Sequence, residues 1–503
     1  MSRFLNILLL ALVWPSFLVA ERIQVPKHHQ SIQAAIDAAE SGDTIEVAAG
    51  TYNERIVLIP GITVRSVGVK GKGRLGLARA EAAIIDGGGE DGDSPGVTMA
   101  EGATLDGFTI TRIGVYDDDR WQKDWEQKGE NQSHEHIGNF GVPGIAITGI
   151  SCTVSNNIVH HNGDTGIAIQ GAEENRCAPL VSGNVCFRNM GGGIGSMNGS
   201  TALIDTNTCF ENLYAGIGHN GASPLVTRNV CYHNVRAGIG VSEGASPIVR
   251  KNRCYDNRRA GIGIRSGDGT RPVIEDNECY ENEMAGIGTE DKAAPIIRNN
   301  RCYRNKLAGI GCGESSSPLI ADNHCFENKA AGVGVNSAKP LLLRNRIEKN
   351  ERAGIGISGT SKARVLDNTC IENRLVAIGI PDGAEALLQG NTLVRTGGMP
   401  PIVAILGGSK AVLIDNSIKG GGVAGVLLEG SLNAMGNVIE GKKGGAGILA
   451  RKNSEATLTN NRITGYRDAV SDQGARSIIN HDQPAEEAGA EEPPKSAHRH
   501  RNQ

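Results

Sequence analysis

The sequence predicts an all-β fold, a single-stranded right-handed parallel β-helix (solenoid) with a short N-terminal capping helix. Three observations support this prediction. One asparagine recurs at intervals of 21 to 27 residues, mostly close to 23, which indicates a repeat architecture. Each repeat carries an Ile-Gly-Ile alternation with the period of two that is typical of short strands. Glycine is abundant, at 69 residues, while aromatic residues make up only 4% of the chain, as a narrow core of stacked aliphatic side chains requires.

The repeat is clearest at 252–264, where Asn-Arg-Cys-Tyr-Asp-Asn is followed after two residues by Ala-Gly-Ile-Gly-Ile. Three short strands and their turns make one coil, and coils rise by about 4.8 Å, so the marked coils predict a rod of roughly 60 Å. Identical residues then stack, and the recurring asparagines form a ladder at one corner. These asparagines are Asn157, Asn184, Asn207, Asn229, Asn252, Asn277, Asn300, Asn323, Asn345, Asn368, Asn391, Asn416, Asn437 and Asn461.

The N-terminal part divides into two segments. Residues 1–20 have a basic Arg3 and a short apolar run, which predicts a cleavable signal peptide and a secreted or periplasmic protein. A buried N-terminal helix is the alternative. Residues 21–112 are expected to hold the N-terminal cap and first coils, with the capping helix inside 31–41.

The remaining chain divides into an inserted loop at 113–143, repeats at 144–477 and a tail at 478–503 whose composition predicts disorder. A long insertion in a regular solenoid is typical of a functional segment. Its position in the coil places it where it can fold over the neighbouring outward-facing glycine strip.

Residues 113–143 carry the candidate catalytic and metal-binding residues. The carboxylates of Asp117, Asp118 and Asp119 are the oxygen ligands that Ca²⁺ takes, so we predict calcium there. His134 and His136 are candidates for acid, base or ligand roles. The alternative is a merely solvated acidic loop.

Eight cysteines share one repeat position, which predicts a buried ladder of free thiols. Stacked residues stay about 4.8 Å apart at Cβ, whereas a disulfide needs about 3.8 Å; disulfides or a soft-metal site are the alternatives. Cys152 and Cys177 lie off the ladder, and a bridge between them is a further hypothesis. The ladder cysteines are Cys186, Cys209, Cys231, Cys254, Cys279, Cys302, Cys325 and Cys370.

Two outward rows suggest where a ligand binds. Aromatic residues follow the ladder cysteines, and Tyr232, Tyr255, Tyr280 and Tyr303, together with Trp121 and Trp125 of the insertion, are predicted to bind sugar rings through their faces. The alternative is that the rings of the row stack on one another. A row of strand glycines indicates close approach of a ligand, partner or loop to the backbone, or else relaxed packing. These glycines are Gly195, Gly218, Gly240, Gly263, Gly288, Gly311, Gly334, Gly356 and Gly379.

The segments 31–36 (Ser-Ile-Gln-Ala-Ala-Ile), 42–45 (Gly-Asp-Thr-Ile) and 50–54 (Gly-Thr-Tyr-Asn-Glu), with the Asn-x-Ile/Cys and Gly-Ile-x-Ile units, resemble the cap and repeats of the pectin lyase-like superfamily. Its members include pectin methylesterases, alginate epimerases and the periplasmic NosD-like accessory proteins. The resemblance covers about residues 23–470 and implies the fold. It implies no single activity, because this fold hosts lyases, hydrolases, epimerases and binding proteins. The sequence has no counterpart of the methylesterase signatures or of the epimerase Asp-Pro-His motif, so no catalytic residue is carried over.

These patterns lead us to expect an extracytoplasmic protein that binds or processes an acidic polysaccharide. The net charge of −4 gives no reason to expect nucleic acid, and no later stretch is apolar enough for membrane insertion. An enzymatic version would be a lyase or epimerase in which Ca²⁺ neutralises the sugar carboxylate while a base removes the C5 proton. The alternatives are a non-catalytic surface or periplasmic scaffold and a NosD-like accessory protein.

Overall fold

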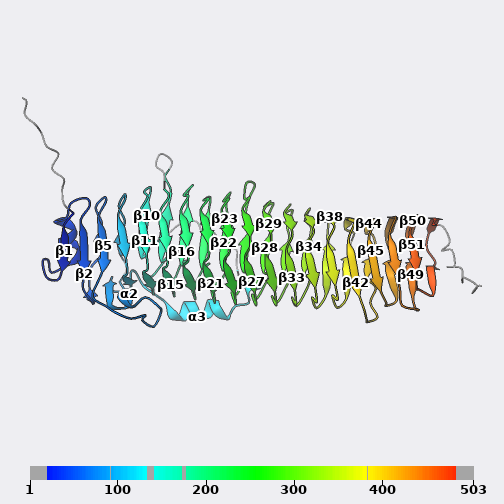
Figure 1. Cartoon of the computed structure of the whole chain (residues 1–503), viewed down its shortest axis with the longest axis horizontal. Coiled ribbons are helices and arrows are strands. Elements are labelled where there is room, and N and C mark those ends of the chain that lie inside the picture. Colours follow the sequence, from blue (N-terminus) through cyan, green and yellow to red (C-terminus); the bar gives the residue numbers. More distant parts are fainter. Residues whose placement is uncertain (1–19, 91, 133–140, 173–176, 382, 483–503) are drawn as a thin grey trace, which may run out of the picture.

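The computed structural model describes residues 20–90, 92–132, 141–172, 177–381 and 383–482. They form a straight rod of stacked coils whose two ends are the two ends of the described chain (Figure 1). Three parallel sheets, here called A, B and C, run along it, and each coil of the repeat region contributes one strand to each in that order. The expected right-handed parallel β-helix is confirmed. Sheet A has 19 strands within the described residues, so at about 4.8 Å per coil the rod is about 90 Å long and extends beyond the coils that the recurring asparagine marks.

Each sheet runs nearly the whole length of the rod. Sheet A begins with β1 (Arg22–Val25) and β2 (Thr44–Val47) and ends with β50 (Glu455–Thr459) and β53 (Ser477–His481). Sheet B runs from β3 (Gly50–Tyr52) to β51 (Arg462–Thr464), and sheet C from β4 (Ile56–Val57) to β52 (Asp468–Gln473). In the middle of sheet B lie β12 (Ile158–His160), β15 (Val185–Phe187), β18 (Thr208–Phe210), β21 (Val230–Tyr232), β24 (Arg253–Tyr255), β27 (Glu278–Tyr280), β30 (Arg301–Tyr303) and β33 (His324–Phe326). In the middle of sheet C lie β13 (Ile167–Gln170), β16 (Ile194–Met197), β19 (Ile217–Asn220), β22 (Ile239–Ser242), β25 (Ile262–Ile264), β28 (Ile287–Thr289), β31 (Ile310–Cys312) and β34 (Val333–Asn336).

The N-terminal end of the rod is closed by α1 (Ile32–Asp37). Ser31 is its N-cap and accepts a hydrogen bond from the backbone N–H of Ala34, which satisfies one of the unpaired donors of the first turn. Ile32 and Ile36 are fully buried, so the helix covers the otherwise exposed first coil. The predicted capping helix is confirmed. A second short helix, α2 (Ala78–Ala82), lies beside sheet B.

Two asparagine ladders stabilise the corners of the coils. The expected ladder lies between sheets A and B, where each side-chain Nδ2 donates to Oδ1 of the next coil, as from Asn252 to Asn277 at 3.0 Å. A second ladder lies between sheets B and C, and Asn257 and Asn282 are joined in the same way at 3.0 Å. Both ladders are buried. The side-chain amides therefore make the hydrogen bonds that water would otherwise make to the polar groups of each turn. Sequence reasoning missed the second ladder, although Asn257 follows Asn252 by five residues in a repeat that recurs throughout the chain.

All eleven cysteines are buried free thiols. The predicted thiol ladder is confirmed, with Cys254 directly opposite Cys231 and Cys279 in the parallel register. Cys152 and Cys177 are likewise unbonded, so the hypothesis of a bridge between them is wrong. Burial raises the pKa of Cys312 and of Cys370 to about 12, which keeps both thiols protonated and unreactive.

The C-terminal boundary differs from the expected one. β53 pairs in parallel with β50, and its register extends to His481, so regular structure continues past residue 478. Without β53, the backbone N–H and C=O groups along one edge of β50 would be unpaired. Residues 483–503 and the expected signal peptide up to residue 19 lie outside the described residues. No helix in the described part of the chain is long and apolar enough to cross a membrane.

Candidate functional site

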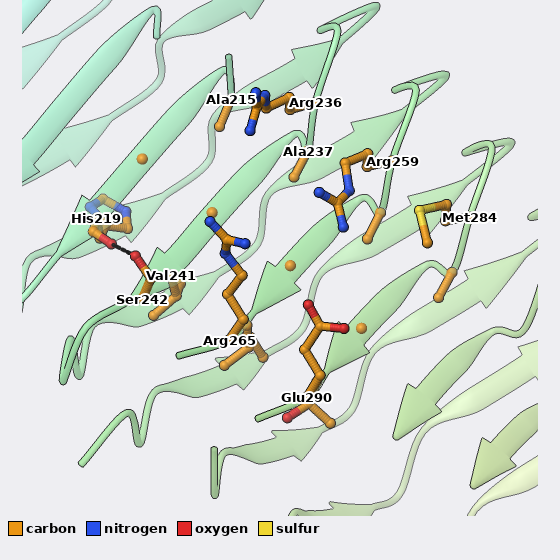
Figure 2. Close-up of a pocket in the computed structure, with 18 of the residues that line it drawn as sticks. Ala215, His219, Arg236, Ala237, Val241, Ser242, Arg259, Arg265, Met284 and Glu290 are labelled. Carbon is orange, nitrogen blue, oxygen red and sulfur yellow. Dashed lines mark hydrogen bonds between the residues drawn. The ribbon is translucent and has the colours of Figure 1, made fainter. Parts of the chain in front are cut away.

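The outer face of sheet C carries a groove of about 480 Å³ that follows the rod axis across several coils. β19, β22, β25, β28, β31 and β34 supply its floor, and β16 lines one end of it. Figure 2 shows that its side chains enter from two rims, one at the start and one at the end of these strands. The volume lies within the range of ligand-binding clefts.

The floor of the groove is a row of glycines. A Cβ added to Gly240 would meet nothing closer than the Cβ of Ala215 at 3.6 Å, and one added to Gly218 would meet nothing within 4 Å. The first is an ordinary van der Waals contact, and the second position is open. None of the floor glycines has the positive φ that favours glycine. Neither packing nor backbone conformation therefore requires glycine here. The floor glycines are Gly218, Gly240, Gly263, Gly288, Gly311 and Gly334; Gly195, the preceding member of the same row, also lines the groove but is buried.

A second glycine row two residues earlier in each coil has a different cause. A Cβ on Gly261 would lie 2.7 Å from the carbonyl oxygen of Gly286, and one on Gly238 would lie 2.7 Å from that of Gly261. These glycines allow one coil to approach the next at the corner, so they are required by the fold. The contrast between the two rows shows that only the floor row lacks a structural reason.

The middle of the groove is positively charged. Arg236 and Arg259 enter from one rim, and Arg265 and Glu290 from the other (Figure 2). All four side chains are half-buried, and the Arg236 guanidinium lies 4.7 Å from the centre of the Tyr214 ring. Burial lowers the pKa of Arg259; Glu290 opposes this shift, while Arg265 and Arg236 add to it. Three guanidiniums against one carboxylate favour an anionic ligand.

The four tyrosines predicted to bind sugar lie outside the groove, in a stack on the outer face of sheet B. Tyr232 and Tyr255 are 5.1 Å apart with 4° between their planes, and Tyr280 and Tyr303 are 5.0 Å apart with the same angle. Phe210 and Phe326 continue the stack at its two ends. Both faces of each tyrosine are thus covered by neighbouring rings. The row matches the self-stacking alternative, because in-register aromatic residues reach offset-stacking distance.

The insertion folds into α3 (Asp118–Glu126) and the 3₁₀ helix η1 (Gly129–Asn131). Figure 1 shows α3 lying alongside the coils, parallel to the rod axis. Trp121 is buried against a cluster formed by Met190, Leu213 and Val235, and its Nε1 donates to the carbonyl oxygen of Glu211 at 2.7 Å.

The second tryptophan completes this anchor. Trp125 stacks on Trp121 at 5.5 Å, and the guanidinium of Arg258 lies 4.3 Å from the centre of its ring. Both tryptophans, predicted to bind sugar, hold the helix to the corner between sheets B and C. Among the described residues of the insertion, none lines the groove, so the expectation that it folds over the glycine strip is wrong for this part of the segment.

The predicted calcium ligands have other partners. Asp117 is the N-cap of α3 and accepts from the backbone N–H of Arg120 at 2.9 Å. Asp118 pairs with Arg188 at 2.8 Å, and Asp119 is exposed. The described residues contain no group of three or more His, Cys, Asp or Glu side chains able to hold a metal ion. His134 and His136 lie outside the described residues, so the calcium prediction gains no support from the described part of the insertion.

A buried histidine beneath the groove escaped the sequence reasoning. His219 is 4% exposed and its Nδ1 lies 2.7 Å from the Ser196 hydroxyl. It stands in the inward-facing column that Val241 occupies in the next coil. Burial lowers its pKa to about 3, so it is neutral near pH 7. The repeat pattern contained the signal, since a histidine interrupts a column of mostly aliphatic residues.

Comparison with known proteins agrees with the fold. Residues 133–270 and 261–393 match the family model described as the right handed beta helix region. No curated protein matches the sequence.

Among solved structures, a periplasmic alginate epimerase is 12% identical, with 70% of this chain and 77% of that chain covered and a TM-score of 0.39. The catalytic unit of a GH87 alpha-1,3-glucanase from Streptomyces thermodiastaticus strain HF3-3 is 13% identical, with 71% and 64% covered and a TM-score of 0.43. An alginate lyase from Paenibacillus is 13% identical, with 56% and 94% covered and a TM-score of 0.39. Likenesses of this size identify neither a substrate nor a reaction. The two matched stretches of the family model together span residues 133–393, more than half of the chain, and the chain belongs to the right-handed β-helix family.

Proposed function

We propose that this chain is an extracytoplasmic protein that binds an acidic polysaccharide along the groove of sheet C. The main support for this proposal is the row of six floor glycines, at which neither packing nor the backbone angle φ requires a glycine. A glycine within a strand is less stable than alanine by about 0.5–1 kcal/mol, so the row costs about 3–6 kcal/mol. That is a substantial part of the free energy of unfolding of a typical domain. A ligand that needs direct access to the backbone accounts for this cost.

The shape of the groove favours a linear polymer. The six floor strands follow one another along the axis, so at about 4.8 Å per coil the floor is about 24 Å long. The broad face of a pyranose ring can lie against a surface without side chains. Several sugar units of an extended chain therefore fit along the floor.

The charge of the groove favours an acidic polymer. Arg236, Arg259 and Arg265 face one carboxylate, that of Glu290, among the described residues that line the groove. Guanidinium groups bind carboxylates in a bidentate manner. Among the described lining residues Glu290 is the one carboxylate, and His219, which also lines the groove, is only 4% exposed, so the proposal is confined to binding. The extracytoplasmic location rests on the expected signal peptide at 1–20.

A calorimetric titration of the purified chain with a polyuronate and with a neutral glucan tests the proposal. We expect saturable binding of the polyuronate that weakens with salt and much weaker binding of the glucan. Arg259→Gln should weaken binding by roughly tenfold, the effect of losing one charge-assisted contact. Arg304→Gln is the matched control, because Arg304 is exposed and pairs with Glu327 outside the groove. Equal binding by Arg259→Gln and the wild type would refute the assignment of the site.

A further inference from the structure

The groove is not uniform along its length. The first rim presents Tyr214, Arg236 and Arg259 in three successive coils, and then Met284 and Leu307 in the next two. Met284 is half-buried, and Leu307 is 40% exposed. The rim thus changes from polar and cationic to apolar within one coil step.

The opposite rim changes at the same place. Arg265 follows β25, Glu290 follows β28, and Gly313 follows β31. In the coil of Gly313 the groove is formed by Leu307, Ala308, Gly311, Cys312 and Gly313, and none of these side chains carries a charge. Among its described lining residues, the groove therefore has a cationic half, a single carboxylate at the boundary, and an uncharged, mostly apolar half that ends at Asn336.

This arrangement is unfavourable for a polymer with a carboxylate on every sugar. Leu307 lies two coils, about 10 Å along the axis, beyond Arg259. A uniform polyuronate whose carboxylate pairs with Arg259 would place further carboxylates beside Glu290 and Leu307. The first meets a like charge, and the second loses water without gaining a partner.

We infer that the groove recognises an acidic heteropolysaccharide in which a uronate is followed by a neutral sugar that carries a methyl group. The inference rests on the proposed function and specifies its ligand. The uronate carboxylate binds Arg236, Arg259 and Arg265, and Glu290 accepts a hydrogen bond from a hydroxyl group of the neutral sugar. The methyl group packs against Met284 and Leu307, which gives their exposed apolar surface a partner.

A 6-deoxyhexose and an O-acetylated hexose are two neutral sugars that supply such a methyl group. Three probes separate them from a simple polyanion. The first is an unsubstituted polyuronate, the second is a polymer of alternating uronate and 6-deoxyhexose, and the third is an O-acetylated acidic heteropolysaccharide before and after alkaline deacetylation. We expect one of the two methyl-bearing probes to bind roughly tenfold or more tightly than the polyuronate, which is the usual value of a well-placed apolar group.

Leu307→Arg is the decisive variant, because it extends the row of cations and changes a side chain that is 40% exposed. We expect this variant to bind polyuronate more tightly than the wild type does and to bind the methyl-bearing polymer more weakly. Leu375→Arg is the matched control, since Leu375 has a similar exposed position on the same rim but lies outside the groove lining.

The outcomes separate this inference from the proposed function. If wild-type chain binds polyuronate at least as tightly as both methyl-bearing probes, and Leu307→Arg leaves the preference unchanged, the inference is overturned while the proposed function stands. If none of the acidic polymers binds, the proposed function itself fails. A preference for a methyl-bearing probe that Leu307→Arg reverses supports the inference.

Discussion

The outer faces of sheets B and C are built by the same coils, yet their repeated residues do different things. On sheet B the rings from Phe187 to Phe326 stack on one another at 4.8–5.1 Å. On sheet C the repeated residue is a glycine with room for a side chain that it lacks. Repetition alone therefore does not indicate function in a solenoid. Stacking between the rings accounts for the row on sheet B, whereas packing does not account for the glycines of sheet C, and we propose that a ligand occupies the space above them.

The largest effect is expected at the corner that the two faces share. Asn257→Ala removes hydrogen bonds to Asn282, to the carbonyl oxygen of Cys231 and from the side chain of Asn234. Leaving several buried polar groups unpaired should lower the free energy of unfolding by about 4 kcal/mol. Denaturant unfolding measures this loss. Ser223→Ala, at an exposed position, is the control, and a loss below about 1 kcal/mol for Asn257→Ala would show that the ladder is not what holds the two faces together.

An effect of intermediate size on the free energy of unfolding, seen at acidic pH, is expected from His219 beneath the groove. The pKa of His219 is about 3 in the folded chain, below its ordinary value of 6.5, so the unfolded chain takes up the proton first as the pH falls. The contribution of His219 is fully present above pH 6.5 and is lost progressively towards pH 3, by about 2 kcal/mol at pH 5. His219→Val copies the next coil, and its loss of stability between pH 7 and pH 5 should be smaller by that amount. An identical pH dependence in both proteins would contradict the account.

The smallest effect on the free energy of unfolding is expected from a substitution on the outer face of sheet B. Tyr255→Leu removes two stacking contacts, with Tyr232 and Tyr280, and should lower the free energy of unfolding by about 1 kcal/mol. Polysaccharide binding should stay unchanged. Thermal unfolding and a binding titration of the same sample measure both. Weakened binding would restore the interpretation of the tyrosine row as a sugar-binding surface.

Sequence reasoning predicted the fold well because the repeat period translates directly into stacking. The period identified the first asparagine ladder, the thiol column and the glycine row. The period did not identify the groove. Arg236 and Arg265 lie at opposite ends of neighbouring strands of sheet C, and the repeat does not show that both side chains enter the same groove. Sequence reasoning also assigned Trp121 to ligand binding by its chemistry, whereas the side chain is only 4% exposed and holds α3 to the corner.

The central claim is that the floor glycines are kept for a ligand and not for the fold. The triple variant Gly240→Ala, Gly263→Ala and Gly288→Ala tests it directly when unfolding and polysaccharide binding are measured on the same protein. The account predicts that the free energy of unfolding rises by about 1.5–3 kcal/mol while binding weakens by roughly tenfold or more. Gly261→Ala, whose new Cβ would lie 2.7 Å from a carbonyl oxygen, should instead destabilise the chain by about 2 kcal/mol. A triple variant that is less stable than the wild type, or that binds the polymer equally well, would contradict the account.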